Sequence, residues 1–207
     1  LSQSTNQDYN DTYIYIKGGT IDVVVGGAGA SATYGNRIVQ ATGGKVNYAL
    51  FGGSNGVTGG DSGSYLGTLN GDSYVYVGGH AEIGDETLVN NNTMQEVSEV
   101  EAGSVFGIGN GNSSSQGVGS VDNSIVIIDG NALVRRNVYG GGNYGSTGYS
   151  SSSSTSTTYV DIHGGTINGS VYGGGNNNGS GRNTVSSTIT ITMDGGTVGD
   201  AIYGGSR

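Results

Sequence analysis

Residues 159–176 read YVDIHGGTINGSVYGGGN, and residues 189–205 read ITITMDGGTVGDAIYGG. Both segments hold the same elements in the same order: an alternating stretch, a glycine pair, a few residues, an aliphatic–aromatic pair and a second run of glycine. In the alternating stretch every second side chain is apolar, which is the period of a β-strand with one buried face. We therefore expect two strands whose inward side chains are Val160, Ile162, Ile191 and Met193.

The same pattern recurs six times along the chain. Its aromatic position falls at Phe51, Phe106, Tyr139, Tyr172 and Tyr203. Val24 and Val25, which precede another glycine pair, form a degenerate first copy. We interpret the long step from Phe51 to Phe106 as one insertion, residues 86–102, with no repeat missing. Each repeat is expected to supply two strands and two turns.

A single repeat has too few inward apolar side chains to bury a core, whereas stacked repeats bury a continuous one. The sequence therefore predicts an all-β fold, a parallel β-helix or β-solenoid of about six coils. We expect a lead-in at residues 1–12 and then one domain over residues 13–207. A Ser/Thr-rich loop is expected at residues 146–158, and its composition leaves O-glycosylation open.

Equivalent residues of stacked coils form columns along the axis. The residue four after the aromatic one is asparagine in four repeats, at Asn55, Asn110, Asn143 and Asn176. A column of amides can form side-chain hydrogen bonds from coil to coil. The alternative, that asparagine recurs because these turns need left-handed backbone geometry, stays open. The five aromatic residues are expected to stack in a column of their own.

The VYGGG segments at residues 138–142 and 171–175 resemble the glycine-rich repeats of large bacterial cell-surface and adhesin-like proteins. The resemblance covers almost the whole chain, from Tyr13 to Gly205. It implies a right-handed parallel β-helix of the autotransporter-passenger kind. It also implies an extracellular or cell-surface location and a structural or adhesive role within a longer protein or filament. No catalytic or ligand-binding residue is carried over, because the repeat motif of such proteins is structural.

Composition argues against several classes of function. Sixteen acidic and seven basic residues leave a net charge of −9, which repels nucleic-acid phosphates and anionic lipids. Without cysteine there is no disulfide, thiolate metal site or thiol nucleophile. No apolar run approaches the roughly 20 residues that span a bilayer, and no signal segment precedes the repeats, so we interpret the chain as a mature or excised segment. We expect no nucleic-acid partner, no membrane insertion, no cofactor and no enzymatic activity.

Two glycine-rich motifs fail on context. Gly140, Gly142 and Gly145 have the spacing of a dinucleotide-binding turn, but a serine-rich stretch follows where that motif needs a helix. The calcium-binding nonapeptide repeat is also excluded, because Ser31 stands where that motif has aspartate.

The position just before the glycine pair carries the first candidate site. Along the six repeats this position reads Lys17, Thr42, Val77, Asp129, His163 and Asp194. Stacking would place His163 between two carboxylates, with Tyr159 outward on the same strand. Such carboxylates raise the pKa of an imidazole, which suits acid–base chemistry or an oxygen-rich metal site. The other interpretation is a solvated row of charges at a turn.

Outward tyrosines are the second candidate. They are Tyr13, Tyr15, Tyr159 and one of Tyr74 and Tyr76. Such rings suit a glycan or protein partner, or they stack only to stabilise the sheet. A carbohydrate-binding or carbohydrate-active β-helix is the alternative function, and it requires Asp129, His163 and Asp194 to meet tyrosines in a groove. An ice-binding solenoid would need a flat array of outward threonines, which only Thr190 and Thr192 supply.

The insertion and the two ends complete the expectations. Met94, Val97 and Val100 have helical spacing, so we expect a short amphipathic helix approached or capped by residues 90–92. We expect this helix to pack on the solenoid, the alternative being a protruding contact site. Both ends of the solenoid are expected to be open, so that further repeats or head-to-tail copies would cover them.

Overall fold

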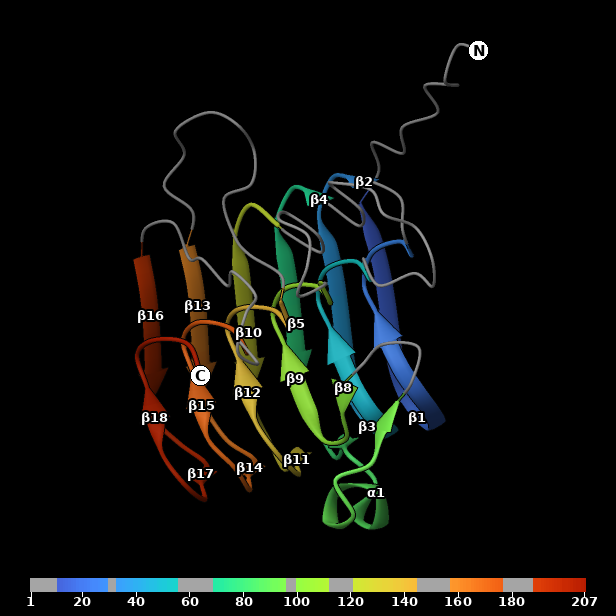
Figure 1. Cartoon of the computed structure of the whole chain (residues 1–207), viewed down its shortest axis with the longest axis vertical. Coiled ribbons are helices and arrows are strands. Elements are labelled where there is room, and N and C mark those ends of the chain that lie inside the picture. The colour runs from blue at the N-terminus through green and yellow to red at the C-terminus, as the bar shows by residue number, and fades with distance from the viewer. Residues whose placement is uncertain are drawn as a thin grey trace.

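The computed structural model describes residues 11–29, 33–55, 69–95, 100–111, 121–144, 157–176 and 188–207. These residues form six coils stacked along one axis, and neighbouring coils pair in parallel (Figure 1). The fold class predicted from the repeats, an all-β parallel solenoid of about six coils, is therefore confirmed. Coil 1 is the bent strand β1 (Thr12–Val25), and coil 2 is the bent strand β3 (Arg37–Phe51).

In the other four coils the same path is divided into three strands. Coil 3 comprises β5 (Ser73–Val77), β6 (Glu82–Ile83) and β9 (Ser104–Phe106), and coil 4 comprises β10 (Ser124–Ile128), β11 (Leu133–Val134) and β12 (Val138–Tyr139). Coil 5 comprises β13 (Thr157–Ile162), β14 (Thr166–Ile167) and β15 (Val171–Tyr172), and coil 6 comprises β16 (Thr188–Met193), β17 (Thr197–Val198) and β18 (Ile202–Tyr203). The two-residue strands β2 (Thr33–Tyr34) and β4 (Leu69–Asn70) pair with each other.

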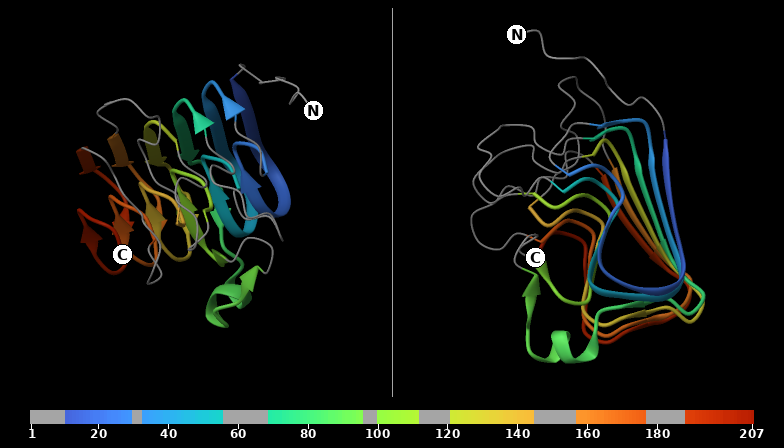
Figure 2. Two further views of the ribbon diagram at one scale, coloured as in Figure 1. Left: turned by 45° about the horizontal axis from the view of Figure 1, so that its top comes forward. Right: turned by 90° about the vertical axis from the view of Figure 1, so that its right-hand side faces the viewer.

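Each coil therefore has three faces, and the prediction of two strands per coil was wrong. Figure 2, right, looks along the stack and shows a three-sided outline. The extra corner lies between the second and third strands, at residues 168–170 in coil 5. No glycine pair marks this corner, since a side-chain amide of the neighbouring coil holds it: Asn137 Oδ1 accepts the backbone N–H of Ser170 at 2.9 Å. The short strands on either side leave no alternation long enough to identify the corner from sequence.

The register of the repeats agrees with the sequence at the insertion and at the first coil. Phe51 pairs with Phe106 across the long step, and Val25 pairs with Phe51. One position of the candidate row was misaligned. Val77 pairs with Ile128, so the residue of coil 3 that corresponds to Asp129 is Gly78. The sequence alignment was displaced by one residue here because it used the position before the glycine pair. In coil 3 that position is Val77, the last residue of the strand, whereas in coil 4 it is Asp129, the first residue after the strand.

Apolar side chains of all three faces meet in one core that runs through the stack. Val160 and Ile162 are fully buried there, as predicted, and full burial of such a side chain contributes about 1.5–3 kcal/mol. Ile191 packs against the same core and is only partly buried. Met193 is in register with Ile162 but 43 % exposed, because it lies on the last coil.

A row of interior hydroxyls closes the corner between the third face and the first. Ser124 Oγ donates to the carbonyl of Gly140 and Thr158 Oγ1 to that of Gly173, both at 2.7 Å. This corner needs glycine because the coils approach so closely: a Cβ on Gly140 would lie 2.5 Å from the carbonyl oxygen of Gly173. In coil 2 the corresponding residue is the buried Arg37, whose guanidinium donates to nearby backbone carbonyls.

The insertion leaves the solenoid after Gly84 and returns at Gly103. These glycines lie so close that a Cβ on Gly84 would be 2.7 Å from the Cα of Gly103, so the coil continues in register across the excursion. The insertion contains α1 (Glu86–Asn90), capped by Asp85, whose carboxylate accepts the backbone N–H groups of Thr87 and Leu88. Figure 2 places this helix outside the three-sided outline.

The predicted amphipathic helix was wrong. Residues 94–95 and 100–101 form an antiparallel pair, β7 (Met94–Gln95) with β8 (Val100–Glu101), and Val97 lies outside the described residues. The helix lies earlier and ends at Asn90, because Asn92 adopts a left-handed backbone with φ of 50°. Asn90 is therefore the last residue of the helix, and Asn91 and Asn92 follow it instead of leading into it.

Basic residues tie the base of the insertion to the solenoid. Arg136 donates from Nε to the carbonyl of Ala102 at 2.8 Å and from Nη2 to Asn92 Oδ1 at 2.8 Å. Lys45 Nζ lies 2.6 Å from Asp85 Oδ2, and this contact raises the pKa of Lys45 and lowers that of Asp85.

The boundaries of two predicted segments change or lie outside the description. Residues 146–156 of the expected Ser/Thr-rich loop are not among the described residues, and Thr157 and Thr158 belong to β13. Residues 1–10 of the expected lead-in also lie outside, and β1 already begins at Thr12. In the part of the chain that is described, no helix is long and apolar enough to cross a membrane.

Candidate functional site

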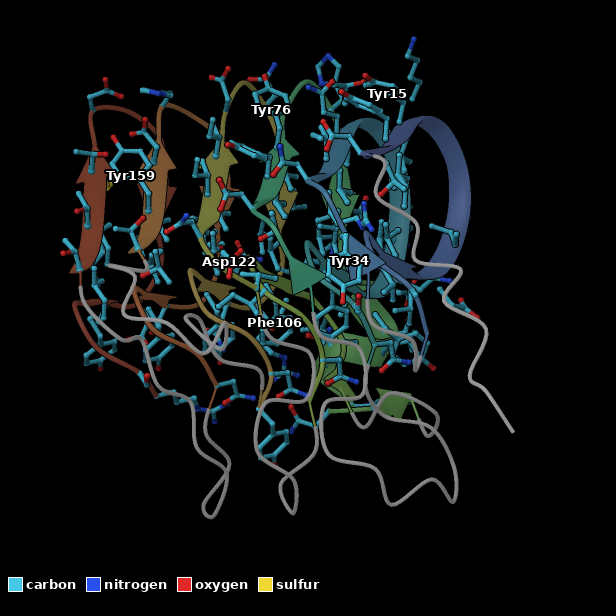
Figure 3. All side chains as sticks on the ribbon, turned by 90° about the horizontal axis from the view of Figure 1, so that it is seen from above. Tyr15, Tyr34, Tyr76, Phe106, Asp122 and Tyr159 are labelled. Carbon is cyan, nitrogen blue, oxygen red and sulfur yellow. The ribbon has the colours of Figure 1, made fainter. Side chains whose placement is uncertain are left out.

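We call the first sheet the face formed by β5, β10, β13 and β16 together with the first parts of β1 and β3. The candidate site lies on the outer side of this sheet, at the edge where its strands end. Figure 3 shows Tyr15, Tyr76 and Tyr159 along this side of the solenoid. Because side chains alternate along a strand, the tyrosines point outward while the valines and isoleucines between them point into the core. Tyr74 and Tyr76 occupy alternate positions of β5, so both face outward, where the sequence left a choice between them.

His163 forms the centre of a polar network on coils 5 and 6. Its Nδ1 lies 2.7 Å from Asp194 Oδ1, and its Nε2 lies 2.9 Å from Asp161 Oδ2. The hydrogen bond to Asp194 raises the pKa of His163, and the negative charge of Asp161 adds to the effect. Both carboxylates favour the imidazolium form. The side chain of His163 is 43 % exposed, so the ring is accessible to solvent and to a ligand.

The register places Asp129 and Asp194 on the coils on either side of His163, as the stacking implied, but only Asp194 bonds the imidazole directly. The second direct contact is Asp161, two residues earlier near the end of β13, while Asp129 acts on His163 through its charge. The imidazole reaches Asp161 because residues two apart on a strand share a face. Sequence reasoning missed Asp161, although its outward position in the alternation could have identified it.

Tyr159 and Thr192 extend the network along the first sheet. Thr192 Oγ1 lies 2.9 Å from Tyr159 Oη and 2.8 Å from Asp161 Oδ1. Tyr159 Oη in turn lies 3.4 Å from Asp161 Oδ2. Of the predicted stripe of Asp129, Tyr159, His163 and Asp194, the last three thus belong to one hydrogen-bonded cluster that also contains Asp161 and Thr192.

Asp129 belongs to a second cluster, with Tyr76. The hydroxyl of Tyr76 donates to Asp129 Oδ2 at 3.0 Å, and the backbone N–H of Gly130 donates to Asp129 Oδ1 at 2.6 Å. The bond from Gly130 lowers the pKa of Asp129, and the bond from Tyr76 adds to this. Burial, followed by the bond to Asp129, raises the pKa of Tyr76. The Tyr76 ring also lies against Gly78, where any side chain would overlap it. Tyr76 is therefore held in one orientation.

A shallow apolar groove adjoins this cluster. Its volume is about 300 Å³, and its outward-facing lining is Ile38, Gln40, Tyr74, Tyr76, Ile125 and Ile127. Tyr76 belongs to both the groove and the Asp129 cluster. The arrangement thus combines aromatic and aliphatic surface with a carboxylate at its edge. It also partly meets the condition set for the carbohydrate alternative, since the charged row and the tyrosines meet at Tyr76 and at Tyr159.

Tyr13 and Tyr15 lie on coil 1 and do not line the groove. They are 57 % and 56 % exposed, and their rings stack with centroids 6.2 Å apart. Their register partners on coil 2 are Ile38 and Gln40, so the outward tyrosines form no continuous ladder on the first sheet.

The predicted aromatic column is present on the third face. Successive rings stack with centroids 4.8–5.0 Å apart, in the order Phe51, Phe106, Tyr139, Tyr172 and Tyr203. The first three rings are buried and Tyr203 is 47 % exposed. Burial makes this column a structural feature over most of its length, not a ligand-facing one.

The four asparagines form the predicted amide ladder. The side-chain Nδ2 of Asn110, Asn143 and Asn176 donates to the Oδ1 of Asn55, Asn110 and Asn143, at 3.2, 2.8 and 3.0 Å respectively. Among described residues other than glycine, only Asn92 and Tyr144 have positive φ. Left-handed geometry therefore does not explain why asparagine recurs here.

Over the described ranges, no group of three or more histidine, aspartate or glutamate side chains is placed to hold a metal ion. Asp161, His163 and Asp194 act instead as mutual hydrogen-bond partners. No protein-family model, curated protein or solved structure matches this chain.

Proposed function

We propose that this chain is a structural and adhesive β-solenoid segment of an extracellular bacterial surface protein or filament. The observation that supports this most directly is the continuity of its columns. The core, the stacked aromatic rings and the amide ladder each pass from coil to coil. Every coil is thereby held mainly by its neighbours, which produces a stiff rod with an extended surface.

The proposed location outside the cell follows from the resemblance of the VYGGG repeats to those of cell-surface proteins. The rod is stabilised by backbone pairing, ring stacking and side-chain amides, and without cysteine its stability does not depend on the redox state of its surroundings. The net charge of −9 opposes sideways clumping of such rods. The outer face of the first sheet would then be the adhesive surface, since it carries half-buried tyrosines beside carboxylates.

Antibodies raised against the purified chain test the location. We expect them to label intact cells of the source bacterium as strongly as permeabilised cells. Brief protease treatment of intact cells should remove the signal. Labelling that requires permeabilisation would contradict the proposal.

A second candidate function is carbohydrate binding by the groove and the adjoining Asp129 cluster. The observation in its favour is Tyr76, which the bond to Asp129 holds against the groove. Aromatic rings pack against the apolar faces of sugars, while carboxylates and amides such as Asp129 and Gln40 can bond their hydroxyl groups. Because Asp129, Asp161 and Asp194 repel anions, this candidate function is directed at neutral glycans.

A panel of neutral and acidic oligosaccharides tests this candidate. We expect binding to neutral members, with Tyr76→Ala weakening it at least about tenfold, the equivalent of 1.4 kcal/mol. Leu133→Ala, on the second face, serves as the control and should leave binding unchanged. Release of reducing ends that His163→Ala abolishes would instead make the His163 cluster an active site.

A further inference from the structure

The first and last coils of the stack have matching edges. Residues 16–20 of coil 1 and residues 193–197 of coil 6 form turns of equal length, each with a glycine pair. The second glycine has φ of 81° in coil 1 and 76° in coil 6, so this glycine is left-handed in both turns. Following the pairing from coil to coil aligns Ile14 with Ile191 and Ile16 with Met193. Apolar rows therefore continue from one edge to the other.

Both edges expose apolar side chains that the inner coils bury. Ile21 on coil 1 is 47 % exposed, whereas Val46 and Ile83 in the same row are fully buried. Ile202 on coil 6 is 46 % exposed, whereas Val171 beside it is buried. An edge strand with unpaired backbone groups and exposed apolar surface favours the addition of another strand.

Glycine at the coil 1 edge is needed only if another coil lies against it. Gly18 occupies the place of Gly43 and Gly195 on coils 2 and 6. A Cβ on Gly43 would lie 2.7 Å from the carbonyl oxygen of Lys17, and one on Gly195 would overlap the carbonyl of His163, both on the preceding coil. At Gly18 no described atom lies within 4 Å, and its φ is not positive. The described residues therefore give no steric reason for glycine there.

The coil 6 edge also carries a glycine without a described neighbour, at Gly204, and here the missing neighbour is a following coil. Gly204 occupies the place of Gly140 and Gly173, whose Cβ atoms would lie 2.5 and 2.8 Å from a carbonyl oxygen of the following coil. Around Gly204 no described atom lies within 4 Å, and its φ is not positive. Both edges thus keep the glycine that close approach of a further coil requires.

The charges at the two edges are complementary. Lys17 is the first residue after Ile16 in the turn of coil 1, and Asp194 is the first residue after Met193 in the turn of coil 6, so the two residues hold equivalent positions in turns of equal length. The Asp194 side chain is 71 % exposed and contacts His163 on its inner side. A copy stacked on coil 6 through its own coil 1 would bring Lys17 next to Asp194.

We propose that copies of this chain assemble head to tail, with coil 1 of one copy continuing the parallel sheets of coil 6 of the next. The contact is heterologous and does not close, so it produces an unbranched filament. One copy adds six coils of about 4.8 Å each, or an axial repeat of roughly 29 Å. This inference extends the proposed structural role and holds whatever the location of the protein.

Glycine variants at the two edges test the assembly without disturbing the fold. Gly18→Ala and Gly204→Ala each place a methyl group in open space, so circular dichroism and the melting temperature should not change. Each variant should remain monomeric in sedimentation velocity and light scattering. The unmodified chain should show an apparent mass that rises with concentration over the same range. Gly29→Ala is the matched control, because Gly29 also has no described atom within 4 Å but lies outside the turns that align in the register.

Mixing the two variants tests the direction of the contact. Gly204→Ala keeps an intact coil 1 edge and Gly18→Ala keeps an intact coil 6 edge, so an equimolar mixture should form one-to-one dimers and stop there. Symmetric end-to-end association would instead give dimers of one variant alone. Lys17→Asp and Asp194→Lys should each weaken assembly, and the double variant should restore it.

Electron microscopy of the unmodified chain completes the test, with unbranched rods as the expected result. A chain that stays monomeric at high concentration would overturn the proposal. Assembly that is unchanged in both edge-glycine variants would overturn it as well. Neither result would bear on the cell-surface location, which the antibody labelling tests separately.

Discussion

The amide ladder makes a quantitative prediction at Asn143, one of its two buried central members. Asn143 is 1 % exposed, donates to Asn110 at 2.8 Å and accepts from Asn176 at 3.0 Å. Replacement by leucine keeps the approximate size of the side chain and removes both hydrogen bonds. The perturbation thus isolates the polar contribution of one step in the ladder.

The expected cost follows from what the substitution does to each neighbour. Asn110 is fully buried, so its Oδ1 loses this donor away from water, at a cost of about 1–3 kcal/mol. Asn176 is half-buried and its Nδ2 can turn toward solvent, so the loss there is about 0.5–1.5 kcal/mol. We therefore expect Asn143→Leu to lower the free energy of unfolding by about 2–4 kcal/mol.

Guanidinium unfolding followed by circular dichroism measures this loss, provided that the slope of the transition is unchanged. Asn131→Leu is the control, since Asn131 is exposed in a turn of the same coil, and we expect a change within about 0.5 kcal/mol. A loss below about 0.5 kcal/mol for Asn143→Leu would refute the ladder as a source of stability. Asn143→Gly adds a second criterion, because a turn that only required backbone freedom would tolerate it.

Other predictions concern the core, the insertion and the polar network. Ile162→Ala should cost about 2–5 kcal/mol, whereas Met193→Ala in the same row should cost less than half of that, since Met193 is partly exposed; denaturant unfolding of both compares them. Arg136→Ala should speed proteolytic cleavage of the insertion several-fold with little change in the core, as mass spectrometry of the fragments would show. Titration by NMR should place the pKa of His163 above its usual value of about 6.5, and Asp194→Asn should bring it down. Because the folded pKa is the higher one, the contacts of His163 favour the folded state below about pH 6.5, and this advantage is lost as the pH rises through the folded pKa. Unchanged titration in Asp194→Asn would show that the ion pair does not form in solution.

Much of the fold could be predicted from the sequence because a solenoid repeats one local pattern. The pairing of Phe51 with Phe106 could be recognised across an insertion, since both follow an aliphatic residue and precede glycine. The columns of asparagine and aromatic residues followed directly from that alignment. The slip at Val77 shows the limit of the method: aligning glycines instead of strand residues moves a position by one where the turn is longer.

The candidate site was less predictable, because its contacts run both between coils and along a strand. Asp194 could be placed beside His163 by stacking alone, but Asp161 could not, since it reaches the imidazole from the same strand. Likewise Asp129 bonds the hydroxyl of Tyr76 on the neighbouring coil, which depends on side-chain orientation. The groove joins side chains of three coils and leaves no local pattern in the sequence.

The sequence by itself determined the alternation of inward and outward side chains, the number of coils and the columns along the axis. These properties depend on chain periodicity, which is local, and on stacking, which repeats it. Only the tertiary structure decided the third face of each coil, the path of the insertion and the partners of His163. Those features arise where short strands, corner geometry and side-chain rotamers are set by neighbouring coils, and a corner held by the amide of Asn137 has no signature in its own segment.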